Sequence, residues 1–428
     1  TRATDKKYGV QKGLTQRTEA AGQLLDFKKF VGTILQDKRA LNLKLYQALE
    51  GYLDLLAGDH YAADKAFTRT ERMLTGGSEY DEKLFRQLEI WRTLLEILNL
   101  DVKNRYVEDA IQRIRGYDAF QTHAHFEPFL QDWVGAAYAA NDQAGRAFLT
   151  SYDAKAMLYN PRLDVLEDLL KVAAGSNPQI LERAMQIDTN PDLIKARLLE
   201  IKAVRLLSTG QTEAALVALR AIPATQLPLL PKFSPFKEHF SERVTGPVVD
   251  SLVLNRRQIV EKLIDYEFKA KAAEAVNDPV AEWYYYMLGV AWYNMSYFGY
   301  EWEVADYYRS GYNWLRLPQG PVFPLKGAPD GNRENTDLSL SLSYFERVIN
   351  GTHSAELAAR ATFMAARCQQ KQWFTLPATR YQPGSQLIPV LPENYYKYYD
   401  RLIKKYADTE FFKLRVQECK WLAAYARE

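Results

Sequence analysis

The stretch that decides the fold is residues 41–67, LNLKLYQALEGYLDLLAGDHYAADKAF. In its first half, apolar residues recur every three or four positions and so share one face of an α-helix: Leu41, Leu45, Leu49, Tyr52 and Leu56. A turn at Gly58 separates this run from a second helical run. Gly51 precedes Ala63 by twelve residues, and Phe67 follows four later. A small residue on each helix allows close approach and a large one fills the next groove, so the stretch predicts two packed antiparallel helices.

The same spacing recurs along the chain. Later examples are Gly135 with Ala147, Ala203 with Ala215 and Leu219, and a first helix carrying Tyr285, Leu288, Gly289 and Trp292. In the last case the residue twelve positions after Gly289 is Glu301, so we expect Ala305 to serve as the small residue. One helix pair cannot bury its apolar face alone, so recurring pairs predict a stacked helical array.

These residues resemble the tetratricopeptide repeat, whose pattern has an aromatic residue, a Leu-Gly pair and a Tyr, followed by Ala and Phe on the second helix. The resemblance implies an all-α fold, a superhelical solenoid of antiparallel helix pairs. It also implies a non-catalytic scaffold that binds other proteins.

A second recurrence lies near the C-terminus. Residues 344–349 and 398–403 match in residue class at every position, 54 residues apart. Each copy precedes a hydroxyl residue suited to cap a helix, Ser354 or Thr409, and then a helix with a cysteine, Cys368 or Cys419. We expect both cysteines to be buried free thiols.

The second copy, with Tyr399, Leu402, Tyr406, Thr409 and Phe411, resembles the repeats of bacterial outer-membrane assembly lipoproteins and related periplasmic scaffolds. This resemblance implies a component of a bacterial cell-envelope complex. It favours the periplasm or the outer-membrane surface over the cytoplasm.

Three proline-rich segments break the helical pattern. The first, residues 222–247, is the expected connector between an N-terminal array, residues 1–221, and an aromatic-rich C-terminal array, residues 248–428. The other two are long loops at 317–336 and 374–394. Loops of this length are usually functional or disordered, and we expect these to fold over one face of the C-terminal array.

Composition excludes several functions. The 428 residues include 55 Lys and Arg against 53 Asp and Glu, a net charge of +2, so we expect no nucleic-acid partner. Catalytic motifs such as a nucleophile elbow, a phosphate loop, a dinucleotide fingerprint or a zinc-binding His-Glu-x-x-His helix are absent from the sequence. We therefore expect no catalytic residue, no cofactor and no metal site. His123 and His125 are expected in an exposed turn, and the polar run from Asp330 to Asp337 in an ordinary loop.

The longest uncharged stretch, residues 283–300, contains six tyrosines together with Asn294 and Ser296. It predicts a buried or groove-lining helix and not a transmembrane span. Any membrane association would then come through an anchor or a partner.

Aromatic residues are the strongest functional signal. Residues 283–314 hold fourteen aromatic rings, and a helix cannot bury rings on every face against one neighbour. Two interpretations remain open: core packing of rings against the proline-rich loops, or a recognition surface. The candidate partner-binding residues are Trp283, Tyr286, Tyr293, Tyr297, Tyr300, Trp302, Tyr308 and Trp314.

The expected ligand of this surface is another protein. The first alternative is a glycan, since the chain is similar in ring content to the helical starch-binding outer-membrane lipoproteins. The second alternative is an enzyme without a recognisable motif.

Overall fold

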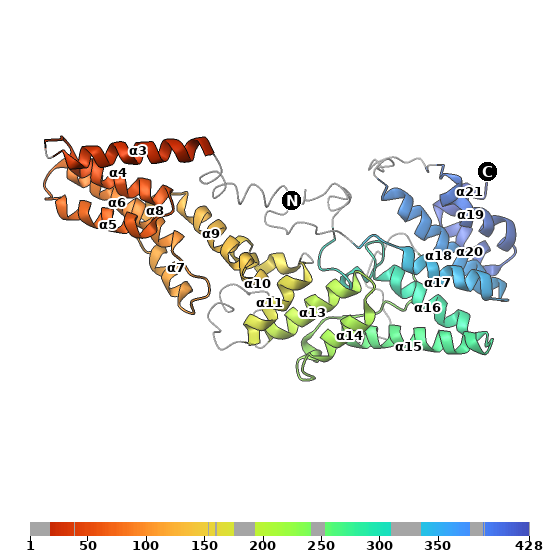
Figure 1. The fold of residues 1–428 in the computed structure, drawn as a ribbon. Coiled ribbons are helices and arrows are strands. Elements are labelled where there is room, and N and C mark those ends of the chain that lie inside the picture. The colour runs from red at the N-terminus through yellow and green to blue at the C-terminus, as the bar shows by residue number, and fades with distance from the viewer. Residues whose placement is uncertain are drawn as a thin grey trace. The chain divides into compact units, whose positions relative to one another are not determined.

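The computed structural model is all-α, as the helical periodicity predicts. It describes residues 18–37, 39–152, 154–158, 161–174, 193–240, 253–309, 335–376, 388 and 390–427. These residues contain eighteen α-helices and one pair of two-residue strands. The chain forms two compact units, Thr1–Ser151 (unit 1) and Tyr152–Glu428 (unit 2) (Figure 1).

Unit 1 is built from helices that pack against their neighbours in sequence. Its helices are α3 (Thr18–Gln36), α4 (Leu43–Leu56), α5 (His60–Met73), α6 (Glu79–Leu98), α7 (Val107–Arg115), α8 (Asp118–Thr122), α9 (Phe126–Ala140) and α10 (Ala144–Ser151). The starts of α5 and α6 are fixed by side-chain caps, since Asp59 accepts the Ala62 N–H and Ser78 accepts the Asp81 N–H.

The pair α4/α5 confirms the close approach predicted from residues 41–67. A Cβ atom added at Gly51 would lie 2.7 Å from two ring carbons of Phe67, so no larger residue fits without displacing the ring. Ala63 and Phe67 are both fully buried. Gly135 on α9 likewise faces α10, where Thr150 is its nearest neighbour.

Unit 2 contains most of the aromatic residues. Its elements are η1 (Ala154–Leu158), α11 (Leu163–Ala174), α13 (Ile194–Leu207), α14 (Thr212–Arg220), η3 (Leu227–Leu229), β1 (Lys232–Phe233), β2 (Leu254–Asn255), α15 (Arg256–Ala275), α16 (Val280–Asn294), η4 (Trp302–Val304), α17 (Ser339–Gly351), α18 (Ala355–Phe374), α19 (Glu393–Tyr406), α20 (Glu410–Glu418) and α21 (Lys420–Tyr425). From α13 to α19, each helix packs against the next. One hydrophobic core runs through these helices.

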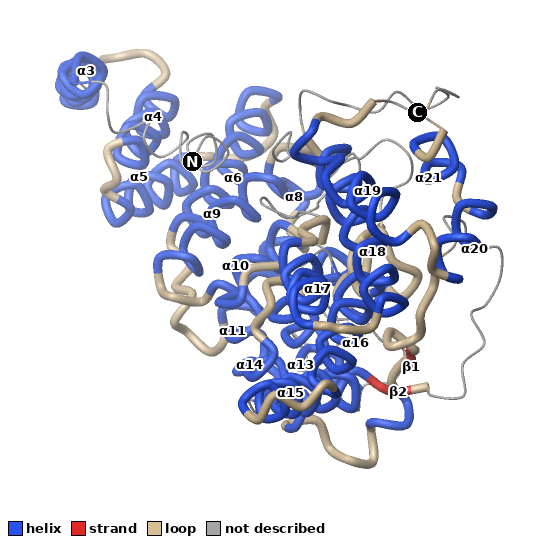
Figure 2. The backbone as a smooth tube through the Cα atoms, turned by 90° about the vertical axis from the view of Figure 1, so that its right-hand side faces the viewer, coloured by secondary structure: helices blue, strands red, loops and turns tan. Residues whose placement is uncertain are grey.

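The expected boundary at residues 222–247 lies inside unit 2, and the division between units falls at Ser151. The reason is that part of the proline-rich connector belongs to the core, with Phe233 and Phe236 buried among the helices. Its strand β1 pairs antiparallel with β2, which directly precedes α15 (Figure 2). Most of the two long loops lies outside the described residues, so their expected position over the array stays a prediction.

The helix pair that begins at Gly289 has a different partner from the one expected. A Cβ atom at Gly289 would lie 2.7 Å from Phe345 on α17, and the Ser341 hydroxyl donates to the Gly289 carbonyl at 2.8 Å. Ser341 therefore takes the place predicted for Ala305, and Phe345, four residues later, is the large residue that packs on Gly289. Ser341 follows Gly289 by 52 residues, 40 more than the twelve of the α4/α5 pair (52 − 12), so this pair contains an insertion of that length.

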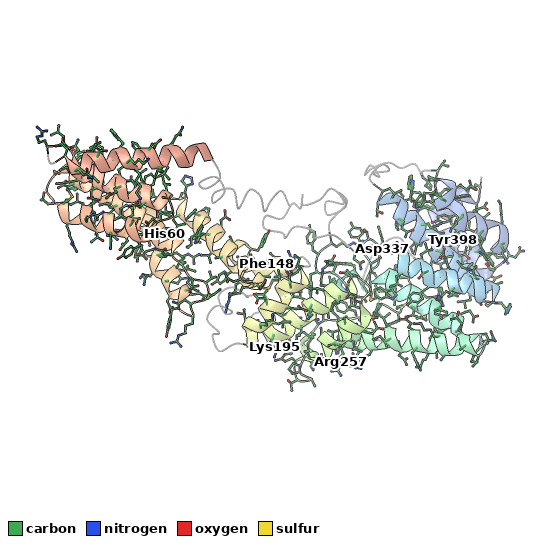
Figure 3. The ribbon with its side chains drawn as sticks, viewed as in Figure 1. His60, Phe148, Lys195, Arg257, Asp337 and Tyr398 are labelled. Carbon is green, nitrogen blue, oxygen red and sulfur yellow. The ribbon has the colours of Figure 1, made fainter. Side chains whose placement is uncertain are left out.

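The 54-residue recurrence corresponds to equivalent helices. Phe345 and Tyr399 are fully buried on α17 and α19, and the two hydroxyl residues cap the helices that follow. Tyr398, labelled in Figure 3, donates to the Glu346 carboxylate of the first copy. Cys368 and Cys419 are buried free thiols, as expected.

Candidate protein-interaction surfaces

The predicted aromatic residues that the structure describes separate into one exposed ring, three buried rings and three half-buried rings. Trp283 on α16 is 43% exposed. The recognition role expected for Tyr286, Tyr293 and Tyr297 does not agree with their positions, because all three side chains are buried. Half-buried rings of the same set are Tyr300, Trp302 and Tyr308. Trp314 lies outside the described residues.

The connector segment, residues 232–240, is bonded to side chains of α16 and of the residues that follow it. The Tyr300 hydroxyl donates to the Ser234 carbonyl at 2.7 Å and to the Lys237 carbonyl at 3.0 Å. The Asn294 amide donates to the Pro235 and Lys237 carbonyls, both at 2.8 Å. Side chains of α16 and of the turn after it thus satisfy the carbonyl groups of a segment that makes few backbone hydrogen bonds of its own.

The far end of the connector segment is held by α18. Arg367 donates to the carbonyls of His239 and Phe240 at 3.4 and 3.1 Å. The Phe240 ring meets Phe363 and Phe411 edge-on. Sequence patterns gave no sign of this contact, because α18 lies more than a hundred residues beyond the segment it holds.

A charged group also joins the segment to the helices. Glu238 accepts hydrogen bonds from Arg360 at 2.8 Å and from the Tyr286 hydroxyl at 2.5 Å. Burial, together with the nearby Glu238 carboxylate, raises the pKa of Tyr286 well above its ordinary value. The phenol therefore remains a neutral donor at physiological pH.

A buried ion pair anchors the base of this arrangement. Arg256, at the start of α15, pairs with Glu200 of α13, and both side chains are almost fully buried. Its remaining donors reach the Val304 carbonyl at 3.1 Å and the Glu303 carbonyl at 2.5 Å. The guanidinium also lies 4.8 Å from the centre of the Phe233 ring. One cation thus fixes α13, the connector segment and the inserted residues after α16 to one another.

A pocket of about 660 Å³ opens beside the connector segment (the connector pocket). It is lined by Lys237 and Glu238 of the segment, Trp283, Tyr286 and Met287 of α16, and Ser354, Glu356, Leu357 and Arg360 at the start of α18. Trp283, Met287 and Leu357 give it apolar walls. Its carboxylates already have partners: Glu238 pairs with Arg360, and Glu356 accepts the backbone N–H groups of Glu410 and Phe411.

The rings around Trp283 do not form a flat platform. Its described ring neighbours, Tyr266 and Tyr284, are inclined to it by 63° and 72°. Sugar rings stack on extended aromatic faces, and these mutually inclined rings do not form one.

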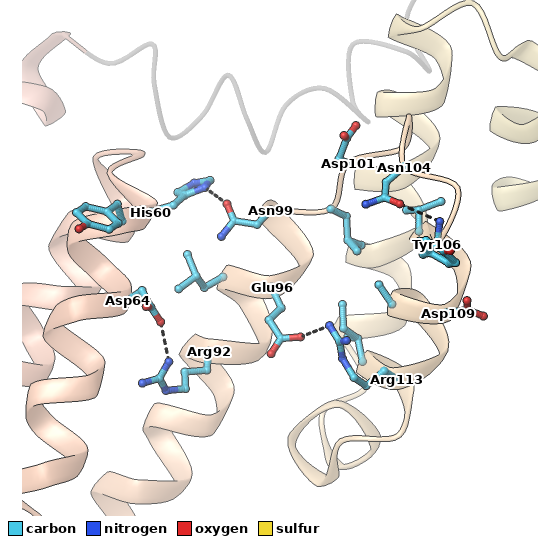
Figure 4. A pocket seen from close by; sticks show the side chains of 16 residues that line it. His60, Asp64, Arg92, Glu96, Asn99, Asp101, Asn104, Tyr106, Asp109 and Arg113 are labelled. Carbon is cyan, nitrogen blue, oxygen red and sulfur yellow. Dashed lines mark hydrogen bonds and ion pairs between the residues drawn. The ribbon is translucent and has the colours of Figure 1, made fainter.

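Unit 1 has a larger pocket of about 1040 Å³, formed by α5, the end of α6, the loop 100–106 and α7 (the α5–α7 groove) (Figure 4). His60 and Asn99 meet across its upper end, with 2.6 Å between the ring nitrogen and the amide oxygen. Glu96 of α6 and Arg113 of α7 pair across its middle at 3.4 Å. Sequence periodicity did not indicate this groove, because its walls come from three helices and a loop.

Other candidate sites have ordinary structural roles. His123 and His125 lie in an exposed turn between α8 and α9, as expected. Burial raises the pKa of the Cys368 thiol to about 12, so this cysteine is unreactive. Among the described residues no group of three or more His, Cys, Asp or Glu side chains could hold a metal ion. No helix in the described ranges is long and apolar enough to cross a membrane.

Comparison of the chain with protein-family models, with curated proteins and with solved structures finds no match.

Proposed function

We propose that this protein is a non-catalytic scaffold, a solenoid of tetratricopeptide-like helix pairs that binds other proteins through extended segments. The spacing of Gly51, Ala63 and Phe67 supports the solenoid, as do the equivalent contacts of Gly289 with Ser341 and Phe345. The close approach at both glycines is the packing that such repeats require.

The observation that carries the proposal is the way in which unit 2 holds its own connector segment. Asn294, Tyr300 and Arg367 each donate to two carbonyl groups of residues 234–240. Contacts to the main chain give affinity for an extended segment, while pockets for its side chains give specificity. The surface is thus already adapted to bind an extended polypeptide.

The connector pocket is the place where a partner would continue this interaction. Its apolar walls are suited to an aliphatic or aromatic side chain of a partner segment. Since the carboxylates of the pocket are paired internally, apolar contact supplies the main attraction. The cell-envelope setting remains part of the proposal and depends on the resemblance of residues 399–411 to envelope scaffolds.

Affinity capture from cells that make the protein naturally tests this function. We expect a defined set of proteins to bind the wild-type chain and to be lost when Trp283 is replaced by alanine. The matched control is Phe268→Ala, since Phe268 is an exposed aromatic residue of the same unit on α15, outside the pocket. Equal capture by wild type and Trp283→Ala would contradict the proposal for this surface.

A further inference from the structure

We propose that the α5–α7 groove of unit 1 is a second interaction surface and that it binds a basic amphipathic segment of a partner protein. This inference goes beyond the surface proposed for unit 2 and rests on the scaffold function only for the class of ligand. The two surfaces lie in different units, so either hypothesis can fail without the other.

The groove has an apolar floor. Leu95 of α6 and Val107 and Ile114 of α7 are buried at its base. Two large rings stand on its walls, Tyr61 at 71% exposure and Tyr106 at 55%. Exposed tyrosines beside a buried apolar floor provide contact area at low entropic cost, as in the centres of protein interfaces.

The polar rim of the groove is acidic. Four carboxylates line it, Asp64, Glu96, Asp101 and Asp109, against two guanidinium groups. The groove therefore carries a net charge of −2 (2 − 4), whereas residues 1–151 as a whole contain 21 basic and 21 acidic side chains. The negative charge belongs to the side chains that line the groove, and Lys65 and Arg105 lie beside them over the Tyr61 and Tyr106 rings.

Both cations of the rim are already engaged. Arg92 pairs with Asp64 at 2.8 Å and holds Glu71 through two further hydrogen bonds. Arg113 pairs with Glu96 and also donates to the Tyr117 hydroxyl at 3.2 Å. They are consequently not available to bind an acidic partner.

Two carboxylates of the rim remain open to a partner. Within the described residues, neither Asp101 nor Asp109 forms an ion pair, and the Asp101 carboxylate accepts the Lys103 backbone N–H at 2.9 Å. A segment with apolar side chains on one face and Lys or Arg on its flanks fits this groove. Its apolar side chains would lie on the floor, and its basic side chains would lie beside these carboxylates. This complementarity identifies the occupant as a basic amphipathic segment.

The test uses the full chain and two fluorescein-labelled model peptides of about 18 residues with the same leucine face, one carrying lysines and the other glutamates on the polar face. Fluorescence anisotropy at about 0.15 M salt measures their binding. We expect the lysine peptide to bind at least tenfold more tightly than the glutamate peptide. Equal binding of the two, or no binding of the lysine peptide, would overturn the inference.

Variants assign the binding to the groove. We expect Asp101→Asn with Asp109→Asn to weaken lysine-peptide binding about tenfold, because two charge pairs are lost. The control pair, Asp26→Asn with Glu79→Gln, removes the same charge from exposed positions of α3 and α6 and should leave binding within about twofold. If both double variants lost peptide affinity equally, the peptide would be responding to overall charge, and the groove would not be its binding site.

A third variant tests shape without changing charge. Ala110→Phe places a ring in the groove, and we expect it to abolish peptide binding while the circular-dichroism spectrum stays that of the wild type. Retained binding in a folded Ala110→Phe protein would contradict the assignment, whatever the aspartate variants show.

Discussion

Two helix pairs in this molecule are built on the same contact and connected in different ways. In α4/α5, Gly51 faces Phe67 and three residues join the helices. In α16/α17, Gly289 faces Phe345 with the same 2.7 Å approach, but the chain leaves α16 at Asn294 and enters α17 at Ser339. A repeat of this kind therefore tolerates a long insertion between its helices, provided that the contact between small and large residues is kept.

The contacts that hold the surrounding helices also differ between the two pairs. Helices α4, α5 and α6 share a hydrophobic core, and the ion pair between Arg92 of α6 and Glu71 of α5 beside it is partly exposed. The residues after α16 are instead held by the buried Glu200–Arg256 pair, and the connector segment covers α16 through hydrogen bonds from Asn294 and Tyr300. Unit 1 also has a buried carboxylate, Asp81, but its partner Lys44 is partly exposed, whereas both members of the Glu200–Arg256 pair are buried.

The largest effect is expected for the buried anchor. Glu200→Ala leaves the Arg256 charge buried without its partner, so we expect a loss of about 3–5 kcal/mol in the free energy of unfolding, measured by urea denaturation. Glu71→Ala is the matched change in unit 1, and we expect about 1 kcal/mol or less because its ion pair is partly exposed. Similar losses in the two variants would remove the distinction between the anchors.

A second comparison concerns the amide side chains at the ends of two helices. Asn294→Ala removes both hydrogen bonds to the connector carbonyls, and we expect a loss of about 2–3 kcal/mol. Asn141→Ala removes one bond to the Ala137 carbonyl within its own helix end and should cost about 0.5 kcal/mol. If Asn294→Ala proves as mild as Asn141→Ala, the connector segment is not held as described.

The shared glycine contact predicts matched effects of the same substitution. Gly51→Ala and Gly289→Ala each place a methyl group against a phenylalanine ring, and we expect each to cost about 1–2 kcal/mol after allowance for the better helix propensity of alanine. Thermal unfolding measures both. A clear cost at Gly51 with none at Gly289 would show that the two contacts are not equivalent.

The smallest effects concern pH, and they differ in direction between the units. The hydrogen bond from Lys44 lowers the pKa of Asp81, so its contribution to the stability of unit 1 is present above about pH 4 and is lost as the pH falls through the folded-state value. The pKa of Tyr286 is raised in the folded state, so the pH dependence runs the other way. The contribution of Tyr286 to the stability of unit 2 is present below about pH 10 and is lost as the pH rises further.

Melting temperatures across this pH range measure both effects. We expect the difference between wild type and Asp81→Asn to shrink in acid, and the difference between wild type and Tyr286→Phe to shrink in alkali. If the difference in melting temperature did not change with pH, protonation of that residue would not be coupled to unfolding.

The sequence predicted what depends on local periodicity. The helix pair of residues 41–67, the caps Ser354 and Thr409 and the buried cysteines all follow from short patterns, and the structure confirms them. The partner of Gly289 could not be predicted in this way, because Phe345 lies beyond an insertion and spacing carries information only across short connections.

The candidate surfaces were predictable only in part. Ring density pointed to the α16 region, but it could not show that Tyr286 is buried and bonded to Glu238 in residues 232–240, a segment that proline content marked as a boundary. The α5–α7 groove has no sequence signature, since its carboxylates come from separate elements. The burial of Tyr286 and the shape of the α5–α7 groove both depend on contacts between segments that are far apart in the sequence.

The central claim is that the connector pocket of unit 2 binds a partner protein, and site-specific photocrosslinking tests it most directly. A photoreactive phenylalanine analogue at Leu357, inside the pocket, is compared with the same group at Phe268 outside it. We predict a discrete protein adduct from position 357 that disappears in the Trp283→Ala background, and none from position 268. Absence of an adduct at position 357, or the same adducts from both positions, would contradict the claim.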